Sequence, residues 1–275
     1  MARTRTLFQN SGSAVLPPYQ ELRIGQYLQS PNGRYRLVLQ EDSNLALYDG
    51  NVAVWVADGN TPYSSTLAYK GSGPTALYVQ YGAFLDDPTR GRKWITTPTD
   101  FTDNDQWNRV HLVLQNDGNL VEVDYRPLWK SNSSAAMQLN KNNEIIPPGT
   151  FLEPGRLYGK GNARLVFQGD GNLVLYGPNN SVLWATYTQG KGATKAVLQG
   201  DGNLVIYNDN GKALWNSRTA QQEGAFIQIQ DDSFIIMRHN PVWARFGYKP
   251  SIKPKHVFNW SKEEWPTRDE IVTTF

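Results

Sequence analysis

Apolar and polar residues alternate along this chain in short runs that recur at a fixed spacing. The segment RLVFQGDGNLVLYGPNNSVLW at 164–184 returns as KAVLQGDGNLVIYNDNGKALW at 195–215, an offset of 31 residues from Gln168 to Gln199. A more divergent copy covers 227–243. Alternation predicts strands, and Asp-Gly between two alternating runs is typical of a hairpin turn. We therefore expect each repeat to form short antiparallel strands, with no helix of any size.

The N-terminal half carries its own three copies, at 36–55, 77–94 and 111–129. A small sheet cannot bury a face alone, but three sheets packed around a pseudo-threefold axis can. The fold class predicted is thus all-β, with two tandem domains of one kind, each made of three antiparallel sheets. The expected boundaries are an N-terminal domain at 1–135, a linker at 136–150, a C-terminal domain at 151–245 and a C-terminal extension at 246–275.

Each repeat ends in a tryptophan, and we expect three of them to meet in the core of each domain. Large aromatic burial is what a small β-domain without disulfides needs. The six tryptophans are Trp55, Trp94 and Trp129 in the first half, and Trp184, Trp215 and Trp243 in the second.

Charge and composition exclude several functions. The chain has 275 residues with 27 Lys+Arg and 25 Asp+Glu, so its formal net charge of +2 argues against a nucleic-acid partner. It has no cysteine, and the three histidines (His111, His239 and His256) lack metal-ligand spacing, so no metal and no cofactor are expected. There is no apolar run of membrane-spanning length, and no signal-peptide core follows Arg3 and Arg5. We expect a protein made in the cytoplasm and released by another route.

A polar pattern, Gln-x-Asp-x-Asn-x-Val-x-Tyr, lies within the repeats. Side chains two apart on a strand share a face, so the pattern predicts a shallow patch with a carboxylate, two amides, a phenol and a small apolar contact. Such a patch suits the donor and acceptor hydroxyls of a sugar, although Asp, Gly and Asn at a hairpin tip can also serve only the turn. The complete copies are Gln168, Asp170, Asn172, Val174 and Tyr176, and Gln199, Asp201, Asn203, Val205 and Tyr207.

Other copies are incomplete. The first keeps Gln40, Asp42, Asn44 and Tyr48 but has Ala46 for Val, and we expect it to bind sugar only weakly. The copy at 115–123 keeps Gln115, Asp117, Asn119 and Val121 but has Val123 for Tyr, so Val123→Tyr is expected to restore part of the binding. In the copy at 230–238, Phe234 replaces Asn and Arg238 replaces Tyr, so we expect no sugar binding there. In the copy at 80–88, only Gln80 matches the motif.

The pattern resembles the monocot mannose-binding, or bulb-type, lectins, which have the β-prism II fold. The resemblance covers roughly residues 25–245. It implies that Gln contacts O3 of a mannose-type sugar, that Asp and Asn hold its axial O2, that Tyr contacts O4 and that Val packs on the ring. None of these contacts needs O6, so D-rhamnose is expected to fit as well as D-mannose. It also implies that the last strand of one domain often crosses to its partner domain.

The tandem layout is similar to one branch, the lectin-like bacteriocins of the LlpA type, which include the putidacins and L-type pyocins. VQYGAFLDD (79–87), NDQWNR (104–109) and PVWARFGY (241–248) resemble stretches of that group. The resemblance implies an antibacterial protein, which we expect to be a monomer, acting extracellularly at the outer membrane of related Gram-negative bacteria. Its implied partners are D-rhamnose or D-mannose glycans of lipopolysaccharide and the outer-membrane barrel-assembly protein BamA.

A glycosidase needs two carboxylates facing one cleft, and here the aspartates recur one per sheet, so an enzyme is not expected. A multivalent mannose-binding lectin that does not kill is the main alternative. The tail residues Trp260, Trp265 and Phe275 are compatible either with packing on the domains or with contact to a receptor.

Overall fold

A computed structural model describes residues 4–57, 64–66, 71–80, 82–89, 91–96, 105–135, 137 and 143–245. The expected tail contacts at 246–275 lie outside this part of the chain. The described residues form strands and two 3-10 turns and contain no α-helix, which confirms the all-β fold class. None of their helices is long and apolar enough to cross a membrane.

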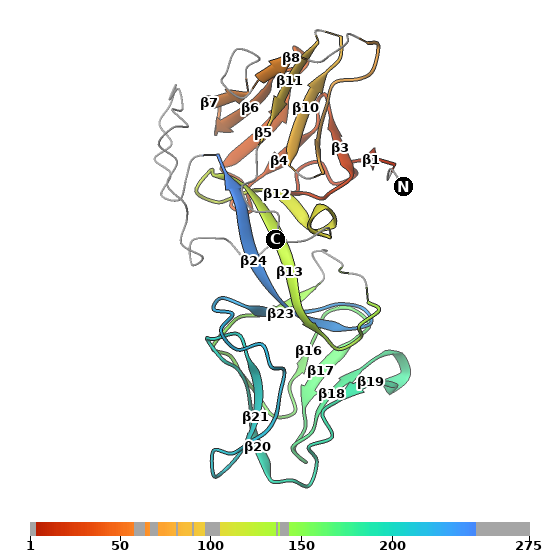
Figure 1. The fold of residues 1–275 in the computed structure, drawn as a ribbon, viewed down its shortest axis with the longest axis vertical. Helices are drawn as coiled ribbons and strands as arrows, with labels where there is room; N and C mark the ends of the chain where they lie inside the picture. The colour runs from red at the N-terminus through yellow and green to blue at the C-terminus, as the bar shows by residue number, and fades with distance from the viewer. Residues whose placement is uncertain are drawn as a thin grey trace. The chain divides into compact units, whose positions relative to one another are not determined.

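The chain divides into two compact units (Figure 1). Among the described residues, unit 1 holds everything up to Tyr125 together with 240–245, and unit 2 holds Arg126–His239. The unit boundaries therefore fall inside two long strands, β13 (Leu120–Lys130) and β24 (Phe234–Ala244).

Unit 1 contains three sheets. Spatial order in the first is β1 (Thr6–Leu7), β3 (Gln20–Arg23), β9 (Ala76–Val79), β10 (Ala83–Asp87), β11 (Arg92–Ile95) and β8 (Ser64–Thr66). The second consists of β4 (Tyr27–Gln29), β5 (Tyr35–Leu39), β6 (Leu45–Asp49) and β7 (Val52–Ala57). The third contains β2 (Val15–Leu16), β12 (Val110–Leu114), which follows the 3-10 turn η1 (Gln106–Asn108), and the unit 1 parts of β13 and β24.

Unit 2 repeats the plan. One sheet consists of β15 (Phe151–Leu152), β20 (Ala193–Leu198), β21 (Leu204–Asn208) and β22 (Ala213–Asn216). The next consists of β16 (Leu157–Tyr158), β17 (Arg164–Phe167), β18 (Leu173–Tyr176) and β19 (Val182–Ala185), with the 3-10 turn η2 (Pro178–Asn180) before β19. The last contains β14 (Glu144–Ile146), β23 (Phe226–Ile229) and the unit 2 parts of β13 and β24.

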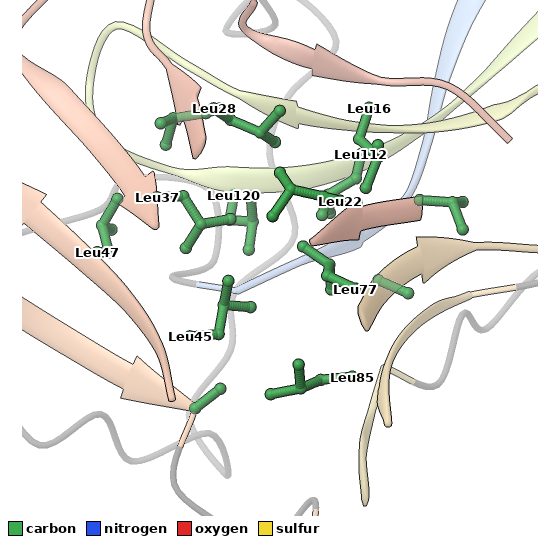
Figure 2. Close-up of a cluster of buried hydrophobic side chains, with 14 of the residues drawn as sticks. Leu16, Leu22, Leu28, Leu37, Leu45, Leu47, Leu77, Leu85, Leu112 and Leu120 are labelled. Atoms are coloured by element: carbon green, nitrogen blue, oxygen red, sulfur yellow. The ribbon is translucent and has the colours of Figure 1, made fainter. Parts of the chain in front are cut away.

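The core of unit 1 is built mainly from leucines on alternate positions of these strands. In the β5–β6 hairpin, Leu37 faces Leu47 and Leu39 faces Leu45, so the period of two places all four on one side of the sheet. Figure 2 shows leucines from several strands gathered around a common centre. Phe167, Leu173 and Phe234 belong to the separate core of unit 2.

Strand β13 carries Trp129, from the first half of the sequence, into unit 2, and β24 carries Trp243, from the second half, into unit 1. In unit 1, Arg245 N donates to Leu120 O (2.8 Å), and in unit 2, Ser131 N donates to Phe234 O (3.0 Å). Part of β13 thus runs beside part of β24 in each unit. This agrees with the strand crossing that the lectin resemblance implies.

The tryptophans meet in threes, as predicted, but the predicted membership was wrong for two of them. Trp243 packs with Trp94 in unit 1 (ring centroids 6.1 Å apart), next to Trp55. In unit 2, Trp129 lies 5.4 Å from Trp184 and 5.9 Å from Trp215. Each unit therefore completes its core with a tryptophan from the other half of the sequence.

Candidate functional site

The first complete motif, here called site 1, consists of Gln168, Asp170, Asn172, Val174 and Tyr176. It spans the β17–β18 hairpin, whose turn is closed by Gln168 N donating to Asn172 O (2.8 Å) and Gly171 N donating to Gln168 O (3.0 Å). Gly171 has φ +86°, and a Cβ there would lie 2.8 Å from the Cβ and carbonyl oxygen of Ala193. Only glycine satisfies both the backbone conformation and the space.

Hydrogen bonds hold the polar side chains of site 1 in place before any ligand arrives. Gln168 Nε2 donates to Tyr176 Oη (2.9 Å), which leaves the phenol free to donate its own proton outward. Asp170 Oδ1 accepts from Asn172 N (2.9 Å), and the residue is exposed, so its carboxylate can accept from a ligand hydroxyl. Gln168 on β17 and Tyr176 on β18 therefore lie together across the hairpin.

Two buried threonines fix the amide of Asn172. Its Oδ1 accepts from Thr186 Oγ1 (3.0 Å) and from Thr188 N (3.3 Å). Thr188 Oγ1 in turn donates to Gly171 O (2.6 Å) at the tip of the turn. Because the oxygen is satisfied by these donors, the amide group can present its Nδ2 donors to a ligand.

The second complete motif, site 2, repeats this geometry on the β20–β21 hairpin. Its members are Gln199, Asp201, Asn203, Val205 and Tyr207. Gln199 Nε2 donates to Tyr207 Oη (3.1 Å), and Asp201 Oδ1 accepts from Asn203 N (3.0 Å).

The amide of site 2 is fixed in the same way as in site 1. Asn203 Oδ1 accepts from Ser217 Oγ (3.1 Å) and Thr219 N (3.2 Å). Sequence reasoning missed these hydroxyl residues in both sites. The signal was present, because each tryptophan that ends a complete repeat begins a Trp-x-Ser/Thr-x-Thr run, at Trp184 and at Trp215.

The valines of the two sites are almost fully covered. Val174 and Val205 are each 2% exposed, so they form the floor beneath the polar side chains. Their contact with a sugar ring stays a prediction, and little of their surface is open to it.

The copy in the first half of unit 1 keeps part of this arrangement. Gln40 Nε2 donates to Tyr48 Oη (2.7 Å), as in unit 2. The amide of Asn44, however, donates from Nδ2 to Asp42 Oδ2 (2.9 Å). Ala57 occupies the position of Thr186 and has no hydroxyl to offer. In sites 1 and 2 the amide oxygen accepts from hydroxyl and backbone donors, whereas here the amide nitrogen donates to the neighbouring carboxylate.

Most side chains of the copy at 115–123, here called the closed copy, are buried. Gln115 is 3% exposed, Asn119 is 2% exposed, and Val121 and Val123 are also buried, which leaves Asp117 as the exposed member. This burial argues against the expectation that Val123→Tyr restores binding, because a phenol at that position would lie among buried side chains. The sequence could not predict this burial, because four of the five motif residues are present in this copy.

The two most divergent copies have shortened turns, and this changes how they align with the motif. Gln230 N donates to Ser233 O (2.8 Å), one residue earlier than in site 1, and Phe226 pairs with Met237 as Arg164 pairs with Tyr176. Ser233 thus occupies the place of Asn, and Met237 that of Tyr. The assignment of Phe234 and Arg238 to those places was wrong by one residue. In the other copy Gln80 N donates to Gly82 O (3.0 Å), so that turn is shorter still.

Nothing in the described part of the chain suggests a metal centre, since no three His, Asp or Glu side chains there are grouped to hold an ion. The aspartates of sites 1 and 2 lie on different sheets, one on β17–β18 and one on β20–β21. Each site is therefore a separate polar patch with one carboxylate.

Comparisons with known proteins point to one kind of fold. No protein-family model and no curated protein matches the chain. Among solved structures it is similar to the fetuin-binding two-domain lectin of Scilla campanulata, with TM-score 0.52 and 23% identity over 84% of this chain and 100% of that one. It is also similar to snowdrop (Galanthus nivalis) mannose-specific agglutinin, solved with methyl-α-D-mannoside (33% identity, 36% of this chain and 93% of that one, TM-score 0.32).

A monomeric mannose-binding lectin of Gastrodia elata is a further similar structure, with 36% identity over 37% of this chain and 93% of that one, and TM-score 0.31. The likeness to the Scilla lectin extends over both units and shows the fold, as the sequence predicted. This chain is an all-β protein with the β-prism II fold in a two-domain arrangement.

Proposed function

We propose that this protein binds carbohydrate, and that sites 1 and 2 of unit 2 are its sugar-binding sites. The observation that carries the proposal is the fixed amide in each site, where Asn172 and Asn203 have their oxygens occupied by hydroxyl and backbone donors. The carboxylate, exposed at Asp170 and half-buried at Asp201, lies beside the oriented amide, so the pair can accept from and donate to one hydroxyl group at the same time. Two identical arrangements on separate hairpins argue against turn chemistry alone.

The ligand we propose is D-mannose or D-rhamnose. Following the lectin resemblance, Asp170 and Asn172 hold the axial O2, Gln168 contacts O3 and Tyr176 contacts O4, with the same roles repeated in site 2. The Gln168–Tyr176 hydrogen bond supports this assignment, because it sets two groups side by side that would meet neighbouring hydroxyls.

Titration of the full chain with D-mannose, D-rhamnose and D-glucose tests this proposal. We expect millimolar to micromolar binding of the first two sugars at each site, roughly −4 to −8 kcal/mol. We expect tighter binding of a polysaccharide that engages both sites, through avidity. Binding of glucose with no binding of mannose or rhamnose would overturn it, since glucose lacks the axial O2.

We further propose that sugar binding directs an antibacterial activity. In this account the protein binds D-rhamnose or D-mannose glycans in the lipopolysaccharide of related Gram-negative bacteria and kills at the cell surface, with BamA as the receptor. The resemblance to the lectin-like bacteriocins at 79–87, 104–109 and 241–248 supports it. The test is a growth-inhibition spot assay on related strains and on mutants that lack the polysaccharide. Growth of every strain would contradict it.

A multivalent lectin that does not kill is the second candidate. The retained Gln40–Tyr48 hydrogen bond in unit 1 favours it, because a third weak site would raise the valency. The same spot assay separates the two, provided that binding of the polysaccharide by the purified protein is shown in parallel.

A further inference from the structure

A groove of about 560 Å³ lies beside site 2, over strands β15, β20 and β21. Its walls include Gln199 and Tyr207, which are members of the site, so the groove and the site form one continuous surface. Beyond the site it is lined by Phe151, Thr194, Lys195, Asn208 and Asp209.

An exposed aromatic ring lies in this groove. Phe151 is 59% exposed, so its ring can be reached by a ligand. It pairs with Val197, which pairs with Val205 of site 2, so its backbone lies two strand spacings, about 10 Å, from the floor of the site. The negative face of an aromatic ring attracts the weakly positive C–H groups on the face of a pyranose.

Polar groups accompany the ring. The Lys195 ammonium lies over one face of the Phe151 ring, 5.2 Å from its centre, and Lys195 pairs with Tyr207 on the next strand. Asp209 is exposed in the turn that follows β21. The groove therefore offers an apolar face, a charged donor and a charged acceptor, which are the contacts that a second sugar residue can use.

Site 1 has different residues at the equivalent positions. Leu157 pairs with Val166 as Phe151 pairs with Val197, so an aliphatic side chain takes the place of the ring. Arg164 takes the place of Lys195, and its guanidinium donates to Ala163 O (2.9 Å) and to Gly161 O. Pro178 stands where site 2 has Asp209.

We propose that the groove binds the second pyranose of a glycan whose first residue occupies site 2, and that site 1 binds a single residue. Phe151 stacks on the second ring, and Lys195 and Asp209 bond its hydroxyls. The inference rests on the sugar binding proposed above and adds a division of labour between the two sites, with site 2 selecting extended chains.

Calorimetry on the full chain tests the subsite. With Asp170→Ala silencing site 1, the ligands are methyl-α-D-mannoside and the three mannobioses linked α1→2, α1→3 and α1→6. At least one mannobiose should bind roughly threefold to tenfold more tightly than the mannoside. Phe151→Leu, which copies the residue of site 1, should remove this gain and leave mannoside binding unchanged, whereas Phe151→Tyr should keep it.

The matched control uses site 1. In a chain with Asp201→Ala, mannobiose and mannoside should bind alike, and Leu157→Ala should leave their ratio unchanged. If the mannoside binds at site 2 but no mannobiose gains, or if Phe151→Leu weakens both ligands equally, the subsite is refuted while the sugar site stands. If the folded Asp170→Ala chain binds no mannoside, site 2 is not a sugar site and the subsite is refuted with it. If the folded Asp201→Ala chain also binds none, the proposed function fails as well.

Discussion

The sugar motifs of unit 2 and the corresponding copies in unit 1 share much of their sequence but differ in how their amides are held and exposed. In site 1, Asn172 receives hydrogen bonds from Thr186 and Thr188 on the adjoining strand end. In unit 1, Asn44 donates to Asp42. Asn119 is 2% exposed against 8% for Asn172, and Gln115 is buried where Gln168 is half-buried. The comparison teaches that the motif letters identify the hairpin, while the residues after the tryptophan and the exposure of the surface decide whether it can bind.

The largest effect is expected from removing the carboxylates of unit 2. Asp170→Ala should cost about 1.5–3 kcal/mol at site 1, because a charged acceptor is lost from the sugar hydroxyl. Combined with Asp201→Ala it should abolish measurable polysaccharide binding by surface plasmon resonance. Asp117→Ala, the matched change in the closed copy of unit 1, should leave binding unaltered. Intact binding by the double variant would show that the site assignment is wrong.

Next in size is a pair of glycine variants two residues apart. Gly171→Ala should destabilise unit 2 by about 1–3 kcal/mol, since φ is positive and the new Cβ meets the backbone of Ala193. It should also lower the affinity of site 1. Gly169→Ala, where no atom lies within 4 Å of the added Cβ, is the control and should change neither property. Denaturant unfolding and sugar titration measure both, and equal effects of the two variants would contradict the geometry.

Val123→Tyr probes the closed copy of unit 1. The side chain is buried on all sides, so the larger ring should destabilise unit 1 by about 1–3 kcal/mol through overpacking. It should add no sugar binding. A gain of mannose binding in this variant, with unchanged thermal stability, would show that the surface opens in solution.

Thr186→Val tests the hydrogen bond that sequence reasoning missed. Removing the hydroxyl should weaken mannose binding at site 1 by about 1 kcal/mol, because Asn172 loses a donor and its amide can rotate. Thr186→Ser keeps the hydroxyl and should bind nearly as well as the wild type. Titration in the Asp201→Ala background reports site 1 alone, and equal binding by both variants would remove Thr186 from the account.

The smallest effect is a pH dependence of the stability of unit 1. Burial raises the pKa of Glu122 to about 7, and burial lowers the pKa of His111 to about 4. The raised carboxyl contributes stability below about pH 4.5 that is lost as pH rises through 7, and the histidine contributes stability above about pH 6.5 that is lost as pH falls towards 4.

Glu122→Gln should therefore be more favourable relative to wild type at pH 8 than at pH 5, because the amide carries no charge to bury. Urea unfolding at the two pH values measures this. A difference between variant and wild type that is constant with pH would contradict it.

Much of the fold followed from the 31-residue spacing, because alternation and Asp-Gly turns are local signals. The spacing did not predict which tryptophans belong to each cluster, because Trp129 and Trp243 end similar repeats. Only the pairing of β13 with β24 decides which core each of them joins. The shortened turn at Gln230 was missed because one deleted residue shifts the pattern while the apolar alternation continues.

The candidate sites divide in the same way. Gln168 and Tyr176 could be paired from strand periodicity, and their hydrogen bond agrees with it. Strand periodicity could not predict the role of Thr186, because Thr186 lies 14 residues from Asn172 along the chain and reaches its amide across the sheet. The burial of Gln115 is likewise a property of the folded chain that no local pattern records.

The central claim, that unit 2 binds sugar through both hairpins and unit 1 does not do so through its closed copy, is tested most directly by a residue-resolved NMR titration with D-mannose. The account predicts saturable amide shifts at 168–176 and 199–207 and at Thr188 and Thr219, with Asp170→Ala removing the first set and leaving the second. Amides at 115–123 should not move. Shifts centred on 115–123, or an unchanged first set in the Asp170→Ala chain, would contradict the claim.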